Sequence, residues 1–202
     1  MLERISHSSA RDYLDCPLLF LYRHILKLQL PEKPIHLHFG KALHHALELA
    51  EKSKADPTEV FQKEFTLDLI AREDISMFLK LQEAGPLILR YHRDNPTGLK
   101  IVKTEEKLVF ADVKDPATGV SLAFKEIVGI IDFETDDGCL GDYKTSSHKY
   151  KQEEVDDSLQ PTFYYLLYYL EHGKLPKEFI YVVFLKKRKR DMRQILRTTR
   201  TL

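Results

Sequence analysis

The pattern of apolar residues changes near residue 95, and this change limits the folds open to the chain. Up to that point apolar residues recur at helical spacing, as in residues 39–55. Beyond it, alternating and β-branched segments occupy 100–112, 120–135, 139–145 and 178–187. A set of helices followed by strands with one helix among them predicts a mixed α+β or α/β core, with a helical region ahead of it.

Capping residues indicate where the helices begin and end. Ser8 or Ser9 is expected to cap the first helix, and Pro17 divides it into two pieces. Asp56 followed by proline marks another start. Gly173 is expected to end the helix that follows the third strand.

Composition excludes several classes of protein. The 202 residues include 31 basic and 31 acidic side chains, so a net charge of zero gives no general support to nucleic-acid binding. Cys16 and Cys139 show no pairing pattern, which indicates a reducing compartment. The chain opens with charged residues rather than a signal peptide, and no apolar run could span a bilayer. We therefore expect a soluble, cytoplasmic protein with no membrane partner.

Charged residues stand at the ends of two adjacent predicted strands. Asp132 lies near the end of one strand, and Asp142 and Lys144 occupy positions i and i+2 of the next, where side chains share a face. A tight turn at Asp137-Gly138 would bring the two aspartates together. Two carboxylates suit a divalent cation, and a lysine beside them would position or activate a metal-bound water and stabilise negative charge during phosphodiester hydrolysis. The competing interpretation is one structural Asp–Lys ion pair and a solvated Asp132.

Two predicted helices carry further candidates. His44 and His45 follow a glycine on one helix and point roughly 100° apart, so the residues alone do not decide which faces a site. A histidine among apolar neighbours is more often a packing residue than a ligand. Gln160 and Tyr164 share a face of the helix after the third strand, where such a row is usually the polar edge of an amphipathic helix.

Five segments together resemble a nuclease family. FGKALHHALE, GIIDFE, GDYKTS and QPTFYYLLYY occur in the order and approximate spacing of the RecB-type exonuclease branch of the PD-(D/E)XK nuclease superfamily. The opening ISHSSARDYLDCPLLFLY is similar to the segment of that branch in which a Ser-rich cap precedes a helix with Cys-Pro. The similarity runs from about residue 5 to about residue 185 and extends to CRISPR-associated and AddB-like nuclease domains.

The resemblance implies a metal site and a reaction. His44, Asp132, Asp142 and the backbone carbonyl of Tyr143 would bind Mg²⁺ or Mn²⁺. A metal-activated water would attack a DNA phosphodiester in line, with Lys144 as the catalytic lysine.

A trailing Gln…Tyr motif of the family is thought to position the DNA backbone and the lysine. The implied catalytic residues are Asp132, Asp142, Lys144, Gln160 and Tyr164.

The resemblance also implies an architecture and partners. The fold would be a restriction-endonuclease-like core with a central mixed sheet flanked by helices, preceded by a helical N-terminal region. Residues 1–95 would contribute the motif histidine and residues 96–202 the nuclease core, together forming one compact domain. DNA, single-stranded or with single-stranded ends, would be the substrate in recombination, repair or spacer acquisition. No G-x-x-x-x-G-K-[ST] motif is present, so a helicase or recombination protein would have to supply any motor.

The cysteines depart from the family pattern. Many relatives with the Cys-Pro segment hold an iron–sulfur cluster, which needs four thiolates as a rule. With only Cys16 and Cys139 available, we expect no iron–sulfur cluster and expect Cys16 to pack as a small apolar residue. The chain is either naturally short or truncated before such a cluster.

A basic segment and an alternative function complete the expectations. Residues 186–200 hold eight basic residues against one acid, which suits DNA phosphates, although a solvated hairpin or a disordered tail would look the same. The alternative function is a catalytically inactive DNA-binding or scaffold module of the same fold, because loss of a DNA-binding surface leaves no trace in the motifs.

Overall fold

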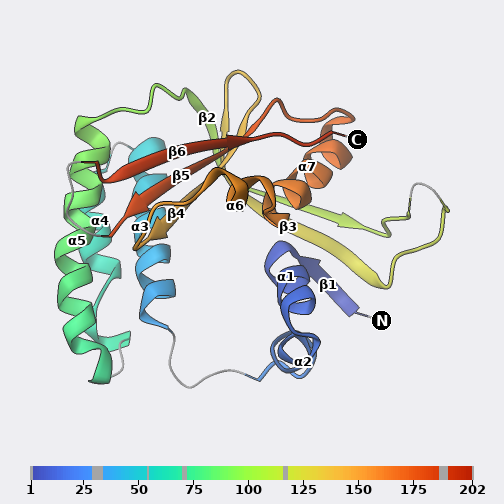
Figure 1. Ribbon diagram of the computed structural model, residues 1–202, viewed down its shortest axis with the longest axis horizontal. Helices are drawn as coiled ribbons and strands as arrows, with labels where there is room; N and C mark the ends of the chain where they lie inside the picture. The colour runs from blue at the N-terminus through green and yellow to red at the C-terminus, as the bar shows by residue number, and fades with distance from the viewer. Residues whose placement is uncertain are drawn as a thin grey trace.

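The computed structural model describes residues 2–28, 34–53, 55–69, 72–115, 118–186 and 191–201. Within these ranges, six strands form one mixed sheet with helices on both faces (Figure 1). The strands are β1 (Leu2–Ser6), β2 (Ile101–Ala111), β3 (Phe124–Thr135), β4 (Leu140–Ser146), β5 (Phe179–Leu185) and β6 (Arg193–Thr198). The α-helices are α1 (His7–Asp15), α2 (Pro17–Phe20), α3 (Ile35–Ser53), α4 (Pro57–Glu64), α5 (Ile75–Asp94), α6 (Gln152–Asp156) and α7 (Leu159–His172). A π-helical turn, η1 (Leu21–Ile25), follows α2, and two 3₁₀ turns, η2 (Leu67–Leu69) and η3 (Arg72–Asp74), precede α5.

Strand β3 is the centre of the sheet. Strand β2 pairs antiparallel along one of its edges, while β1 and β4 share the other edge at different levels. Strand β4 pairs in parallel with β5, and β5 pairs antiparallel with β6. This arrangement confirms the predicted α/β fold with a central mixed sheet flanked by helices.

The N-terminal segment differs from the expectation in two ways. Residues 2–6 lie ahead of the first expected helix, in a region for which no strand was expected, and they form β1, which pairs in parallel with β3. Because β1 ends at Ser6, this residue caps α1 in place of Ser8 or Ser9: its Oγ accepts the backbone N–H of Ser9 at 3.3 Å. The break at Pro17 is confirmed, since α2 begins there.

Two hydrophobic clusters lie on opposite faces of the sheet. Helices α3, α4 and α5 cover one face, with Phe133, Tyr143 and Phe184 among the sheet residues packed beneath them. Helix α7 covers the other, over Ile131 and Tyr181 among others. No helix in the described ranges is both long and apolar enough to span a bilayer.

The alternation of side chains along β3 slips by one residue at Asp132. Ile131 packs on the α7 face, yet Phe133, two positions later, packs on the α3 face. The paired residues of β2 and β3 on either side of this position place Glu105 of β2 opposite Asp132. The backbone of Glu105 is in the left-handed region, with φ of 52°. A paired irregularity of this kind redirects a side chain, as β-bulges do. Asp132 is thereby directed along the sheet toward β4.

Candidate active site

Strands β3 and β4 form a fork, and the candidate residues lie where it opens. The two strands pair over two residues each, 133–134 and 140–141. The next step of this ladder would place Asp132 opposite Asp142, but pairing has ended there. The backbone of β4 beyond this point therefore faces an opening rather than a partner strand.

The narrow end of the fork is sterically fixed. The predicted turn is confirmed, with Gly138 at φ of 81° in the left-handed region that favours glycine. Gly141 has no space for a side chain, because a Cβ atom would lie 1.9 Å from the ring of Phe133. The strands can approach here only because residue 141 is glycine.

Asp132 reaches across the opening to β4. Its Oδ2 accepts the backbone N–H of Tyr143 at 2.7 Å, and Nδ1 of His44 lies 3.4 Å from the same oxygen. Burial, reinforced by the negative charge of Asp142, raises the pKa of Asp132 well above its ordinary value. In a strand the N–H and C=O of one residue point to the same side, so the carbonyl of Tyr143 also faces the fork.

Asp142 is held by a lysine and an amide. Nζ of Lys144 lies 2.7 Å from Oδ2 of Asp142, while the side-chain amide of Gln160 donates a hydrogen bond to Oδ1. The Oε1 atom of Gln160 accepts the hydroxyl of Tyr181 at 3.2 Å, which fixes the amide orientation. Burial opposes the charge on Lys144, but the neighbouring carboxylate of Asp142 outweighs it, and the pKa of Lys144 lies above its ordinary value.

The two histidines of α3 have different partners. His44 lies beside Asp132, whereas Nδ1 of His45 lies 2.5 Å from Glu64 of α4. Burial lowers the pKa of His44, so its ring is neutral at pH 7 and keeps a lone pair for a ligand. The structure thus brings His44 rather than His45 to the candidate site.

Gln160 and Tyr164 take different places on α7. Gln160 contacts Asp142 directly, but Tyr164 stacks on Phe179 with ring centroids 5.7 Å apart. Burial, followed by the charge of Asp142, raises the pKa of the Tyr164 hydroxyl. Tyr164 therefore lies within the electrostatic field of the site without a recorded contact to its carboxylates.

The candidate ligands are of the types that a hard divalent cation binds, although their side chains do not converge on one point. Within the ranges described, no three His, Cys, Asp or Glu side chains come close enough together to form a metal centre by themselves. Two carboxylates, a neutral imidazole and a strand carbonyl are nonetheless ligands that Mg²⁺ and Mn²⁺ accept. Burial first, and then the charge of Asp142, raises the pKa of Asp132, and a cation bound between the carboxylates would oppose both effects.

Two cavities flank the fork and differ in chemistry. One of about 320 Å³ lies on the Asp132 side and is lined by His44, Glu48 and Glu105 among others. The other, of about 340 Å³, adjoins Lys144 and is lined by basic and aromatic residues. Sequence reasoning missed Glu105, because its position opposite Asp132 follows from strand register and from no local motif.

His7 is a second residue that sequence reasoning missed. It begins α1 and lies against Phe163 and Tyr164, with ring centroids 6.4 Å apart in each case. Burial, followed by the charge of Lys144, lowers the pKa of His7 to about 4. The Ser-rich opening contained this residue, but nothing in the sequence linked it to Lys144.

Cys16 differs from its expected environment. It is exposed at the junction of α1 and α2 and does not pack as an apolar residue, because the short helix α2 turns away from the sheet (Figure 1). Cys139 is buried at the start of β4.

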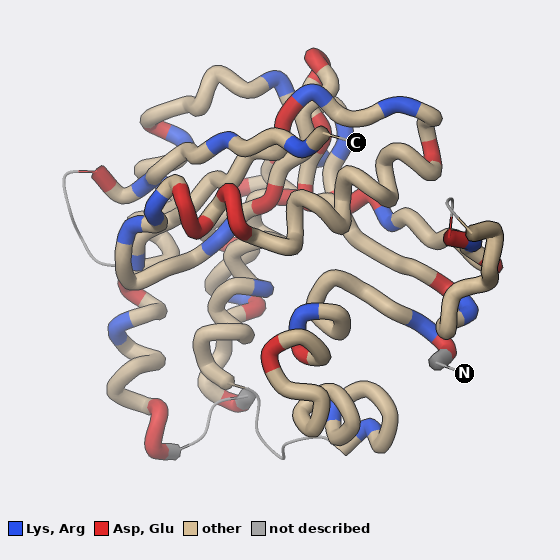
Figure 2. The backbone as a smooth tube through the Cα atoms, turned by 45° about the vertical axis from the view of Figure 1, so that its right-hand side comes forward, with Lys and Arg blue, Asp and Glu red and all other residues tan. Residues whose placement is uncertain are grey.

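The described part of the basic segment folds back as a strand. Residues 187–190 lie outside the described residues, whereas β6 pairs with β5 as one interpretation anticipated. Arg193 contacts His92 at 2.9 Å, and Arg197 contacts Glu178 at 2.6 Å. Basic and acidic residues are interspersed along the chain (Figure 2). These arginines are engaged within the protein rather than gathered on a separate basic surface.

Fold and site together define a nuclease-type α/β protein, with paired aspartates and a lysine at a strand fork. The chain belongs to the PD-(D/E)XK nuclease superfamily, whose family model matches residues 4–200.

Solved structures agree with this fold. The crystal structure of a "Putative exonuclease" from Eubacterium rectale superposes with a TM-score of 0.60 at 16% sequence identity, covering 98% of this chain and 73% of that one. A likeness at this identity shows the fold alone. The crystal structure of SSO0001 covers 88% of this chain at 13% identity, but with a TM-score of 0.37 it carries no argument. No curated protein matches the chain.

Proposed function

We propose that this protein is a divalent-metal-dependent deoxyribonuclease that degrades DNA from strand ends. The observation that carries the proposal is the convergence of Asp132, Asp142 and Lys144 at one strand fork, with His44 and Gln160 supplied by helices on opposite faces. Membership of the nuclease superfamily supports the reaction class. Degradation of DNA from strand ends, rather than cleavage within strands, is part of this proposal.

Lys144 acts as a cation. The neighbouring carboxylate of Asp142 raises its pKa above the ordinary value in spite of burial, which favours the protonated ammonium. A protonated lysine held beside the reacting phosphate stabilises the negative charge that develops on phosphate oxygens. Asp142 fixes the ammonium in this position through their 2.7 Å contact.

Asp132, Asp142, His44 and the carbonyl of Tyr143 would hold the cation. A bound divalent cation supplies Lewis acidity toward a phosphodiester and acidifies water. Asp132 is kept in place by the N–H of Tyr143, so its second oxygen stays available to a ligand. Binding of a cation would relieve the repulsion between the two aspartates.

Gln160 orients Asp142 through a chain of hydrogen bonds. Its amide donates to Asp142 and accepts from Tyr181, whose hydroxyl lies 3.0 Å from Oγ of Ser158 at the start of α7. Each group has a fixed role as donor or acceptor, which restricts rotation of the carboxylate. Gln160 is thus a positioning residue, and Tyr164 supports it from the next turn.

The test is digestion of end-labelled linear DNA, single- and double-stranded, beside closed circular single-stranded DNA. Reactions contain Mg²⁺, Mn²⁺ or EDTA and compare the wild type with Lys144→Met. We expect linear DNA to be degraded only with metal, circular DNA to survive, and the variant to be inactive. Cleavage of circles at the linear rate would contradict end dependence.

Absence of cleavage with retained DNA binding would support the inactive binding module. Equal activity of Lys144→Met and wild type would show that the fork is not the catalytic site. A helicase or recombination protein as partner belongs to the same proposal, and co-purification with the tagged full chain would reveal it.

A further inference from the structure

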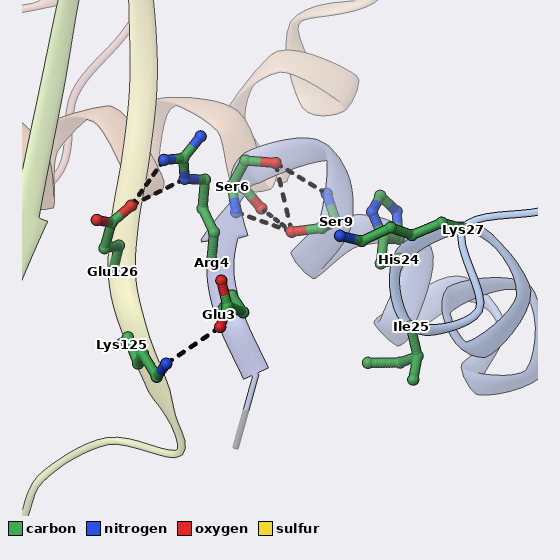
Figure 3. A pocket seen from close by; sticks show the side chains of 9 residues that line it. All are labelled: Glu3, Arg4, Ser6, Ser9, His24, Ile25, Lys27, Lys125 and Glu126. Carbon is green, nitrogen blue, oxygen red and sulfur yellow. Dashed lines mark hydrogen bonds and ion pairs between the residues drawn. The ribbon is translucent and has the colours of Figure 1, made fainter.

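A cavity of about 690 Å³ lies along the contact between β1 and β3, and Ser6 and Ser9 at the start of α1 are among the residues that line it (Figure 3). Four of its charged side chains are paired across the two strands: Arg4 lies 2.8 Å from Glu126, and Lys125 lies 3.1 Å from Glu3. Lys27 adds a further basic side chain, and none of the residues that line this cavity belongs to the fork.

The cavity beside Lys144 has a different character. Lys144 and Gln160 form part of its wall, so any occupant lies next to the proposed reaction site. Its volume of about 340 Å³ is near the lower end of small-molecule sites, which span about 300–1,000 Å³. There is space for one nucleotide and none for a duplex.

The walls combine cationic and aromatic groups. Arg11 of α1 and Lys144 are the cationic groups, and the rings of His148, Tyr150 and Tyr181 form the aromatic part. Arg11 is 61% exposed and makes only a surface ion pair at 3.3 Å with Asp15. Exposed pairs of this kind are weak, so a phosphate can replace the aspartate as partner.

Glu154 is the acidic residue among the cavity walls. Its Oε2 accepts the backbone N–H of Lys151 at 2.9 Å, which ties this carboxylate to the start of α6. The cavity therefore favours an anion with a flat, aromatic body.

Tyr150 is held unusually firmly for a residue outside helices and strands. Its N–H donates to Oε1 of Gln194 at 3.0 Å, and its carbonyl accepts from Nε2 of the same amide at 2.8 Å. One side chain of β6 thus satisfies both backbone groups of Tyr150, and its ring packs partly buried against the hydrophobic cluster under α7. A ring with restricted freedom provides a stacking surface at low entropic cost.

We propose that this cavity binds the terminal nucleotide of a DNA strand, with its base on Tyr150 and its phosphate at Arg11. The inference rests on the proposed nuclease function and explains how a strand end is recognised. A nucleotide seated here has its neighbouring phosphodiester beside Lys144. The volume suits a single nucleotide, as the end of a strand would present it.

The first experiment measures binding without catalysis. Wild-type protein in EDTA is titrated by calorimetry with 5′-dTMP, 3′-dTMP, thymidine and inorganic phosphate. We expect one monophosphate to bind more tightly than thymidine or phosphate, and which one binds identifies the strand end. Failure of both monophosphates to bind, or phosphate binding as tightly as either, would overturn the proposal.

Variants locate the site. Tyr150→Ala and Arg11→Gln should each weaken binding of the monophosphate by roughly tenfold or more, since stacking and phosphate contacts have this size. Tyr150→Phe should retain affinity. Tyr169→Ala, at an exposed tyrosine of α7 outside the cavity, is the matched control and should bind as the wild type does. Unchanged affinity in both Arg11→Gln and Tyr150→Ala would contradict the assignment.

The two proposals fail separately. Metal-dependent cleavage without monophosphate binding would overturn the cavity and leave the nuclease. Monophosphate binding without cleavage would support the cavity and reject the nuclease.

Discussion

Two lysine–carboxylate groups lie along the sheet, each with a hydrogen-bond partner on α7 and with two acids for one lysine. In the first, Nζ of Lys103 lies 2.9 Å from both Glu134 and Glu106, and the hydroxyl of Tyr168 donates to Glu134. The lysine there bridges both acids.

At the fork the same ratio of charges is arranged differently. Lys144 contacts Asp142, while Asp132 lies beside the neutral ring of His44. Among the described residues, Asp132 contacts no lysine or arginine side chain. Under the proposed function, the acid left over beside the Lys144–Asp142 ion pair is the feature that would take a cation, and the bridged group at Lys103 has no such acid.

The largest difference between the two groups should appear in catalysis. Lys144→Met removes the cation from the reacting phosphate, and we expect the rate of DNA cleavage to fall by about 10²- to 10³-fold. Lys103→Met is the matched control and should cleave within about threefold of wild type, since it removes a structural contact. Rates are measured on end-labelled DNA with saturating metal. Equal losses of cleavage rate in Lys144→Met and Lys103→Met would mean that the two lysine–carboxylate groups do not differ in their effect on catalysis.

Metal affinity should separate the two acids next. Asp142→Asn removes a proposed ligand, so Mn²⁺ binding in calorimetry should weaken by roughly 10- to 100-fold or more. Glu134→Gln, which changes a bridged acid, should leave Mn²⁺ affinity unchanged. A loss in Glu134→Gln would mean that the cation binds at the other group.

The geometry of the fork depends on Gly141. Gly141→Ala forces a Cβ against the ring of Phe133, and overpacking should lower the free energy of unfolding by about 1–3 kcal/mol. Urea unfolding monitored by circular dichroism measures it. Gly40→Ala is the control, because its Cβ would lie 3.7 Å from Thr145 and alanine favours a helix. A stability of Gly141→Ala equal to wild type would show that the strands can separate freely.

The smallest effect concerns pH. Hydrogen bonds to Glu134 and then Glu106 raise the pKa of Lys103 above its ordinary value of 10.5. The folded state therefore holds this proton more tightly than the unfolded state, so the stabilisation is complete below pH 10.5 and declines as pH rises through the folded pKa. The difference in unfolding free energy between wild type and Lys103→Met should shrink between pH 9 and 11.5. A difference in unfolding free energy that grows with pH would contradict a raised pKa of Lys103 in the folded state.

Local patterns in the sequence were sufficient for much of the fork. The turn at Gly138, the shared face of Asp142 and Lys144, and the end of α7 at Gly173 all follow from rules that span a few residues. The order of helices and strands predicted an α+β or α/β core, whereas the mixed sheet of the nuclease fold came from the resemblance of five segments to the family.

Other features depend on contacts that no local pattern records. The slip at Asp132 was hidden because Ile131 and Phe133 are both apolar and read as one face. The choice of His44 depends on Glu64, which holds His45 from another helix. Strand β1 is short and partly charged, so only its pairing with β3 makes it a strand.

That pairing has a consequence for how the protein is made. Arg4 and Glu126, which join β1 to β3, lie 122 residues apart in the chain. Closing so long a loop is slow, and contacts of this range form late in folding. A nascent chain must keep its first residues unpaired until β3 has been synthesised. Helix α1, which carries Arg11 to the cavity, therefore joins a fork whose strands lie later in the chain, and the nucleotide site proposed here would be complete only after the carboxylates are in place.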